Sequence, residues 1–176
     1  TLTTESYFSG TTAVRHVHRF DDARLAQWMV ENIEAYAGPL TVVQFKGGQS
    51  NPTYKLITPC QSYVLRRKPP GQLLKGAHAI DREARVLEAL AKANFPVARV
   101  HSLCTDVAII GSWFYVMDCV EGRIVWDVRF PDVARESRPS YFDAMNEAIA
   151  RLHSIDYRSI GLADFGKPGS YFERQI

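Results

Sequence analysis

The chain has 176 residues, 46% of them hydrophobic and 23% charged, which is enough for one domain with a sizeable core. The net charge of +2 is small, and the Lys and Arg residues form no dense basic run, which argues against a nucleic-acid partner. No stretch approaches the roughly 18 consecutive apolar residues of a membrane helix, so we expect no membrane partner either.

The cysteines and histidines give no sign of a metal site. Cys60, Cys104 and Cys119 are widely spaced, and their odd number fits reduced thiols in a cytoplasmic protein better than a disulfide framework. His16 and His18 form a close pair, but they have no acidic neighbours. The polar start of the chain lacks a signal-peptide core. We therefore predict a cytoplasmic protein with no metal ligands among these residues.

The first half of the chain predicts a helix followed by three strands. Apolar residues at helical spacing indicate a helix over 20–36, capped by Asp21 or Asp22 and ended near Gly38-Pro39. Short, partly β-branched runs separated by turn residues are typical of strands. These runs predict strands over 40–46, 53–58 and 62–67.

The second half predicts a helix, two strands and a last helix. The strongest helical pattern covers 79–94, and a later one covers 141–152. Strands are predicted over 107–110 and 113–119, around a turn at Gly111-Ser112. Strands joined by tight turns should pair antiparallel, with the middle helix on one face. The expected fold class is α+β, with a five-stranded antiparallel sheet and one packed helix.

The loop between the first two strands is the first candidate site. Gly47 and Gly48 permit a close backbone turn whose N–H groups can surround an anion, and Ser50 and Asn51 add side-chain donors. A Gly-Gly pair between strands is by itself more often a simple hairpin. The loop alone therefore does not establish phosphate binding.

Glu83 is the second candidate because it falls on the apolar stripe of its helix, between Ile80 and Leu87. An unpaired carboxylate is costly to bury, so Glu83 either reaches solvent at the margin or meets a cation. Strand alternation places Arg66 with Val64 on one face, which makes Arg66 a suitable partner. Both alternatives remain open from the sequence.

An apolar strand that breaks into a connector is the third candidate. Residues 114–122 leave the predicted sheet at Asp118, where backbone groups could bind a flat heterocycle. The glycine loop, the strand cation, the helical acid and this connector follow one another in the order of a kinase N-terminal lobe. In that lobe the cation and acid orient the nucleotide phosphates, and the connector holds adenine.

With these four features in this order, the sequence resembles the aminoglycoside phosphotransferase-like family of kinase-like enzymes. The branch associated with acyl-CoA dehydrogenases is the most similar, through the Arg-Arg-Lys-Pro-Pro-Gly run. The motifs that carry the resemblance are Gly47–Tyr54, Val64–Gly71, Arg82–Leu87, Phe114–Gly122, Leu152–Asp156 and Tyr171–Gln175.

The resemblance implies an ATP- and Mg²⁺-dependent phosphotransferase. Arg66 would replace the usual phosphate-orienting lysine, unless Arg67 or Lys68 fills that role, and Glu83 would orient it. Met117 would lie beside adenine as gatekeeper. The expected nucleotide-binding residues are Gly47, Gly48, Ser50, Asn51, Arg66, Glu83, Met117, Asp118 (through its carbonyl) and Val120 (through its N–H).

The resemblance also implies a domain division. It predicts an N-terminal extension and helix over 1–38, a nucleotide-binding lobe over 39–120, and a connector with the start of an incomplete C-terminal lobe over 121–176. No His-Gly-Asp catalytic loop is present. We therefore expect the catalytic base and metal ligands beyond residue 176, and we expect this fragment alone to be inactive.

Two sequence matches to catalytic motifs are misleading. Asp164-Phe165-Gly166 matches the protein-kinase metal motif, but we expect a surface turn. In His153-Ser154-Ile155-Asp156 the acid comes three residues after the histidine instead of two. Neither stretch supplies a catalytic residue.

The partners follow from the same resemblance. We expect a nucleotide and a small hydroxylated acceptor, for which a hydroxyacyl-CoA, an aminoglycoside or another alcohol are the alternatives. Association with an acyl-CoA dehydrogenase and self-association through an exposed lobe surface are further expectations. The competing hypothesis is a non-catalytic, pseudokinase-type binding or regulatory module.

Overall fold

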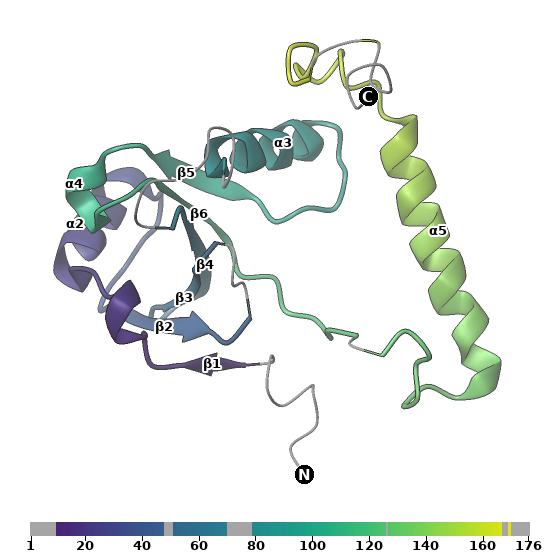
Figure 1. Ribbon diagram of the computed structural model, residues 1–176, viewed down its shortest axis with the longest axis horizontal. Helices are drawn as coiled ribbons and strands as arrows, with labels where there is room; N and C mark the ends of the chain where they lie inside the picture. Colours follow the sequence, from purple (N-terminus) through teal and green to yellow (C-terminus); the bar gives the residue numbers. More distant parts are fainter. Residues whose placement is uncertain (1–9, 48–50, 70–78, 126, 167–168, 170–176) are drawn as a thin grey trace, which may run out of the picture.

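The computed structural model describes residues 10–47, 51–69, 79–125, 127–166 and 169. They form the predicted α+β, kinase-like fold, built on an antiparallel sheet in the order β1-β2-β3-β4-β6-β5 (Figure 1). The sheet has six strands instead of the predicted five, because the sequence did not predict β1 or β5 and the predicted strand over 107–110 is helical. The strands are β1 (Thr11–Thr12), β2 (Thr41–Phe45), β3 (Thr53–Ile57), β4 (Ser62–Arg67), β5 (Val100–Cys104) and β6 (Phe114–Asp118). The helices are α2 (Asp22–Asn32), α3 (Ile80–Lys92), α4 (Val107–Ile110) and α5 (Arg138–Ser154), with 3-10 turns at His16–His18 and Arg135–Ser137.

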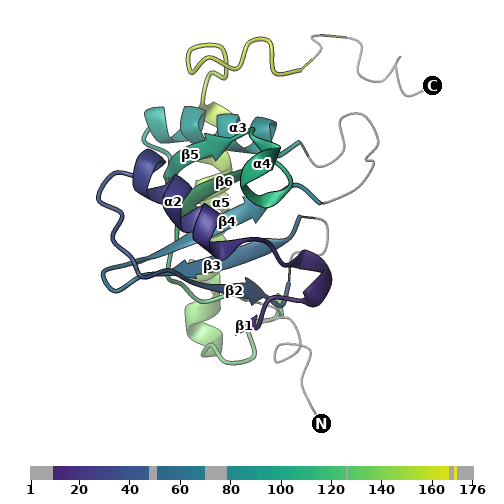
Figure 2. The ribbon, with the colours of Figure 1, turned by 90° about the vertical axis from the view of Figure 1, so that its left-hand side faces the viewer.

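One face of the sheet is covered by α2 and α4 (Figure 2). Asp21 begins α2 as its N-cap, because its carboxylate accepts hydrogen bonds from the amides of Ala23 and Arg24 at 3.0 Å. The alternation of β3, β4 and β6 turns their bulkiest apolar side chains toward these helices. The resulting core contains Leu25, Trp28, Met29, Ile33, Tyr54, Leu56, Tyr63, Leu65, Cys104, Ile110, Phe114 and Val116.

The opposite face carries α3, over β5 and β6. Its fully buried cluster is small and consists of Ile80, Ala84 and Tyr115. Half-buried apolar side chains pack around that cluster: Leu87, Val100, Leu103, Trp113 and Met117. This face is therefore only partly covered by the chain itself.

The predicted strand over 107–110 is wrong. Asp106 caps a short helix there by accepting a hydrogen bond from the Ala108 amide at 2.8 Å, and Gly111 ends it at a φ of 84°. On the side away from β4, β6 pairs antiparallel with Val100–Cys104 instead, a segment for which the sequence predicted no strand. A four-residue apolar run cannot be assigned by periodicity alone, and the flanking Asp and Gly decide it.

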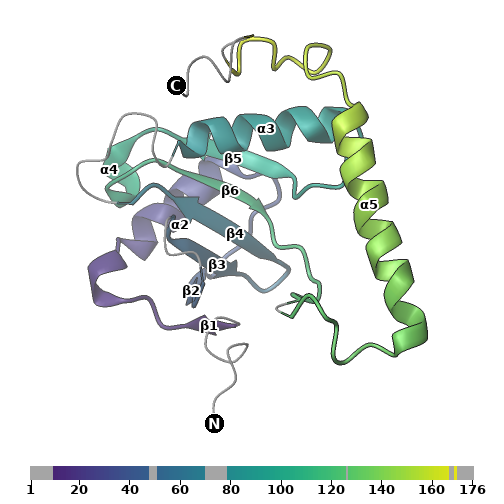
Figure 3. The same ribbon diagram turned by 45° about the vertical axis from the view of Figure 1, so that its right-hand side comes forward.

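Helix α5 stands beside the sheet and buries none of its residues (Figures 1 and 3). It begins at Arg138, three residues before the predicted start. Its apolar side chains recur at helical spacing but remain about half exposed: Phe142, Met145, Ile149 and Leu152. In the described part of the chain, no helix is long and apolar enough to cross a membrane.

Candidate functional site

The predicted phosphate loop connects β2 to β3. Gly47 follows β2 and is half-buried, whereas Gly48 and Ser50 lie outside the described residues. At the other end of the loop, the Asn51 carbonyl accepts a hydrogen bond from Thr53 Oγ1 at 3.0 Å. Thr53 is the register partner of Arg66, so the loop returns to the sheet beside the predicted phosphate-binding cation.

The ion pair expected between Arg66 and Glu83 is present. Arg66 Nη2 lies 3.2 Å from Glu83 Oε1, and the two side chains are 31% and 34% exposed. Of the two alternatives for Glu83, the paired one is therefore right. A pair this accessible contributes about 1 kcal/mol or less to stability, so its main effect is to fix the direction of the guanidinium.

Arg67 lies on the other side of the sheet and is 5% exposed. Its Nε donates to Ser112 Oγ at 2.7 Å, and its Nη1 donates to the His18 carbonyl at 3.3 Å. Lys68 has the same strand parity as Arg66, but its ammonium lies 5.5 Å from the ring centroid of Trp113, which packs against the α3-side cluster. Among the described residues, Arg66 is the one of the three that pairs with Glu83 and so takes the predicted position.

Tyr115 extends the polar environment of the ion pair. It is the register partner of Arg66 and is fully buried. Burial raises the pKa of the Tyr115 phenol, the Glu83 carboxylate raises it further, and the Arg66 charge lowers it, so the phenol stays neutral. Within the described residues, the Tyr115 hydroxyl and Arg66 Nε have no hydrogen-bond partner.

A second cation, Lys55, lies on the same face and was missed by the sequence analysis. Its register partner is Val64, which shares the Arg66 side of β4, so the Lys55 side chain leaves β3 toward that side too. Lys55 is half-buried, and it forms no ion pair with any described residue. Strand alternation, applied to β3 and β4 after pairing them across the turn between them, would have identified Lys55.

The connector leaves the sheet at the end of β6. Met117 is half-buried between its register partners Val64 and Val100. The Asp118 amide donates to the Arg99 carbonyl at 2.9 Å, and Asp118 Oδ1 lies 2.7 Å from His101 Nε2. These contacts fix the point at which the chain turns out of the sheet.

After Asp118 the connector becomes exposed, from Val120 onward. Val120 is 70% exposed, and its amide donates to no described residue. An exposed N–H on a connector anchored by Asp118 can pair with a ring nitrogen of a flat heterocycle.

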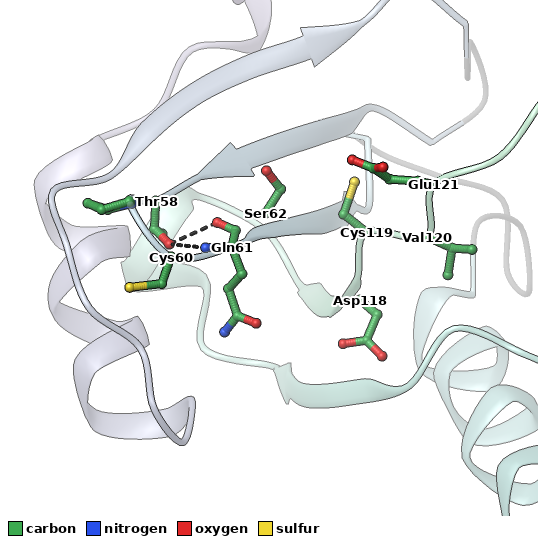
Figure 4. Close-up of a pocket in the computed structure, with 9 residues that line it drawn as sticks. Thr58, Cys60, Gln61, Ser62, Asp118, Cys119, Val120 and Glu121 are labelled. Atoms are coloured by element: carbon green, nitrogen blue, oxygen red, sulfur yellow. Dashed lines mark hydrogen bonds between the residues drawn. The ribbon is translucent and has the colours of Figure 1, made fainter.

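A cavity of about 540 Å³ adjoins the connector (Figure 4). The β3–β4 turn forms one wall and is closed by Thr58 Oγ1, which donates to the Gln61 carbonyl at 2.8 Å. Figure 4 shows the Asp118 and Val120 side chains pointing away from the side occupied by Cys119 and Glu121. The lining residues are Thr58, Pro59, Cys60, Gln61, Ser62, Asp118, Cys119, Val120 and Glu121.

The two misleading motifs take no part in this site. Asp164 lies in a surface turn, as predicted, and its carboxylate pairs with Arg85. His153 ends up in the last turn of α5, and Asp156 Oδ1 accepts from the Arg158 amide at 3.0 Å. The described residues contain no group of three His, Cys, Asp or Glu side chains that could hold a metal ion.

Comparison with known proteins agrees with this geometry. The profile of the phosphotransferase enzyme family matches residues 41–176. The chain belongs to this family. A solved structure of a candidate aminoglycoside phosphotransferase from Ralstonia eutropha JMP134 superposes with a TM-score of 0.78 at 50% identity, covering 89% of this chain and 45% of that one.

The curated relatives that match this chain are named as acyl-CoA dehydrogenases or members of that family. The probable acyl-CoA dehydrogenase IBR3 of Arabidopsis thaliana is 44% identical over 94% of this chain, and acyl-CoA dehydrogenase family member 11 of Gallus gallus is 44% identical over 95%. The human family member 11 is 39% identical over 90%. The chain spans about a fifth of the length of these relatives. The resemblance to the acyl-CoA-dehydrogenase-associated branch is thereby confirmed.

Proposed function

We propose that this chain binds ATP on the α3 side of its sheet, as the nucleotide-binding part of a phosphotransferase that acts on a small hydroxylated molecule. The observation that carries the proposal is the Arg66–Glu83 ion pair, with 3.2 Å between Arg66 Nη2 and Glu83 Oε1. This pair lies on the face of the sheet that α3 covers incompletely. Membership of the phosphotransferase family supports the reaction class.

Arg66 would bind the nucleotide phosphates. Glu83 engages one terminal nitrogen of the guanidinium, which leaves other N–H donors of the planar fork for phosphate oxygens. Gly47, Gly48, Ser50 and Asn51 would cover the phosphates from the loop. Such catalysis acts by positioning and electrostatic stabilisation, so the direction that Glu83 gives to Arg66 is the useful property.

Lys55 would add a second positive charge. It is diagonal to Arg66 across neighbouring strands, a relation that places side-chain origins about 7–8 Å apart. A lysine side chain can cross that distance, so both cations can contact one polyphosphate. Lys55 thereby adds attraction that a lone arginine would lack.

Adenine would lie at the connector. Met117 supplies an apolar side chain, and the Val120 N–H and the Asp118 carbonyl supply a donor and an acceptor two residues apart. The Asp118 amide is already used by Arg99, so it is the carbonyl of this residue that we assign to the purine. The adjoining 540 Å³ cavity gives the base room at the edge of the sheet.

Mg²⁺ would neutralise charge on the phosphates when bound. The described residues offer no carboxylate cluster for it, since Glu83 pairs with Arg66 and Asp164 pairs with Arg85. We therefore assign no metal ligand among the described residues, and we expect the chain to bind nucleotide without transferring phosphate.

The acceptor and the setting of the activity are also proposals. Because the curated relatives are named acyl-CoA dehydrogenases, we propose a hydroxyacyl-CoA acceptor and association with a dehydrogenase, with an aminoglycoside or another alcohol as alternative acceptors. The free cysteines Cys60, Cys104 and Cys119 fit a cytoplasmic location.

Calorimetric titration with Mg²⁺-ATP tests the proposal. We expect the 176-residue chain to bind, Arg66→Ala to lose at least about tenfold in affinity (about 1.4 kcal/mol), and Glu83→Gln to lose less. Arg129→Ala, which removes an exposed arginine elsewhere in the chain, is the control and should bind like the wild type. Equal binding by the wild type and Arg66→Ala would remove Arg66 from the site, and no binding by any of them would favour a module that does not hold nucleotide.

A further inference from the structure

The turn around Asp164-Phe165-Gly166 lies against α3, although about 80 residues separate them in sequence (Figure 3). Arg85 engages both carboxylate oxygens of Asp164 and also donates from Nη2 to the Gly161 carbonyl at 2.7 Å. Arg82 Nη2 donates to the Phe165 carbonyl at 2.6 Å. The Arg82 guanidinium also lies 4.0 Å from the centroid of the Phe165 ring. We call the turn 161–166 with these two arginines the clasp.

The clasp and the nucleotide-facing ion pair use opposite sides of one helical turn. Ile80 and Ala84 are buried against the sheet, and Glu83 points to Arg66 beside them. Arg82 and Arg85 are three positions apart, so they project together from the exposed side. This turn of α3 therefore contacts Arg66 on its sheet-facing side and residues 161–166 on its exposed side.

Among the described residues, few other contacts hold the N-terminal half of α3. Its N-cap residue, Ala79, provides no side-chain hydrogen bond, so the first amides lack the capping that Asp21 gives α2. The buried cluster beneath α3 consists of three residues. The clasp contacts lie at this same end of the helix.

The contacts of Asp164 in the clasp limit its capacity to bind a metal ion. A carboxylate with both oxygens on one guanidinium has little capacity left for a cation. Arg85 lowers the pKa of Asp164, so the carboxylate stays ionised and available to the arginine near neutral pH. The residues that match a kinase metal motif thus contact α3 through Arg82 and Arg85.

We propose that Arg82 and Arg85 are positioning residues, which fasten the turn 161–166 to α3 and thereby hold Glu83 in register with Arg66. The proposal rests on the proposed nucleotide site and adds to it a link with the segment that follows α5. An exposed ion pair contributes little to global stability, so the clasp acts on the local position of α3.

Hydrogen–deuterium exchange of the 176-residue chain, combined with calorimetry, tests the clasp. In the double variant Arg82→Gln/Arg85→Gln we expect faster amide exchange in residues 80–86, unchanged exchange in α2, and Mg²⁺-ATP affinity weaker by about fivefold or more. The matched control is Arg129→Gln, because Arg129 also forms an exposed ion pair, with Asp127, well beyond the end of α3 (Ile80–Lys92) in the sequence. A charge-swapped variant, Arg85→Asp/Asp164→Arg, should recover part of the protection lost in Arg85→Asp.

The two arms separate failure of the clasp from failure of the nucleotide site. Exchange in residues 80–86 that stays at the wild-type rate in the double variant overturns the clasp, whatever happens to affinity. Faster exchange with unchanged affinity overturns its link to the nucleotide. If the wild type itself binds no nucleotide, the proposed function fails, and the exchange arm still decides whether the clasp positions α3.

Discussion

The two faces of the sheet differ in how completely the chain covers them. Under α2 and α4, twelve buried residues form a continuous core, and the buried Arg67 on the same side has its own hydrogen bonds. Under α3, three residues are fully buried, and the surrounding side chains are half-buried and partly charged. The first face stabilises the fold, whereas the second retains polar groups that a ligand can use.

Adjacent residues on one strand illustrate this division. Leu65 and Arg67 point into the covered face, and Val64 and Arg66 point to the open one. A substitution on the first side should therefore change mainly the free energy of unfolding. A substitution on the second side should change mainly nucleotide affinity.

The largest effect is expected from Phe114→Ala. Phe114 is fully buried and contacts Trp28 edge-on, with ring centroids 4.8 Å apart, so its loss leaves a cavity worth about 3–5 kcal/mol in unfolding free energy. Urea unfolding measures the change. The control is Tyr115→Phe at the next position, which removes a buried hydroxyl without a partner among the described residues and should cost less than about 1 kcal/mol.

The two neighbouring arginines should show opposite effects. Arg67→Met breaks one buried and one half-buried hydrogen bond and should lower the unfolding free energy by about 2–3 kcal/mol. Arg66→Met removes an ion pair whose side chains are about one-third exposed, so it should lower the unfolding free energy by less than about 1 kcal/mol. It should, however, weaken Mg²⁺-ATP binding. Urea unfolding and calorimetry on both variants check this, and a reversed pattern would contradict the assignment of the faces.

Gly111→Ala tests the link between α4 and β6. Gly111 adopts a φ of 84°, and an added Cβ would meet Arg67 Nη2 at 3.4 Å. We expect a loss of about 1–2 kcal/mol in thermal or urea unfolding, because L-residues disfavour that conformation. Gly122→Ala is the matched control, since no neighbour lies within 4 Å there, and it should change stability little.

The exposed stripe of α5 should promote self-association, as we propose for the exposed lobe surface. Met145 and Ile149 are each 51% exposed on that stripe. Sedimentation velocity should show a species larger than the monomer that diminishes as concentration falls, and Met145→Glu/Ile149→Lys should shift it toward the monomer. A wild type that stays monomeric at high concentration would contradict this.

The smallest effect concerns Asp164. Arg85 lowers the pKa of this carboxyl, so its contribution to stability is present above the ordinary carboxyl pKa and is lost as pH falls through the lower folded value. In Arg85→Gln, an NMR titration should show the pKa of Asp164 returning toward its usual value. Asp127, whose pKa Arg129 lowers to about 2, should titrate unchanged in the same variant.

The sequence predicted the parts of the fold that repeat a pattern and missed those that depend on distant contacts. Strong periodicity placed α3 and β4, and the alternation of β4 with the acid at position 83 predicted the ion pair. The strand at 100–104 was missed because its half-buried residues show no clear alternation, and 107–110 was wrong because its capping residues were overlooked. The clasp joins residues about 80 positions apart, a pairing that no local pattern encodes.

A nucleotide site on the open face can be tested by methyl NMR on the 176-residue chain, titrated with Mg²⁺ and a non-hydrolysable ATP analogue. Nucleotide binding on the open face should shift the methyl signals of Val64 and Met117, which lie on the α3 side of the sheet, while those of Leu65 and Val116 in the covered core change little. Shifts confined to Leu65 and Val116, or no shift at Val64 and Met117 at saturating nucleotide, would contradict a nucleotide site on the open face.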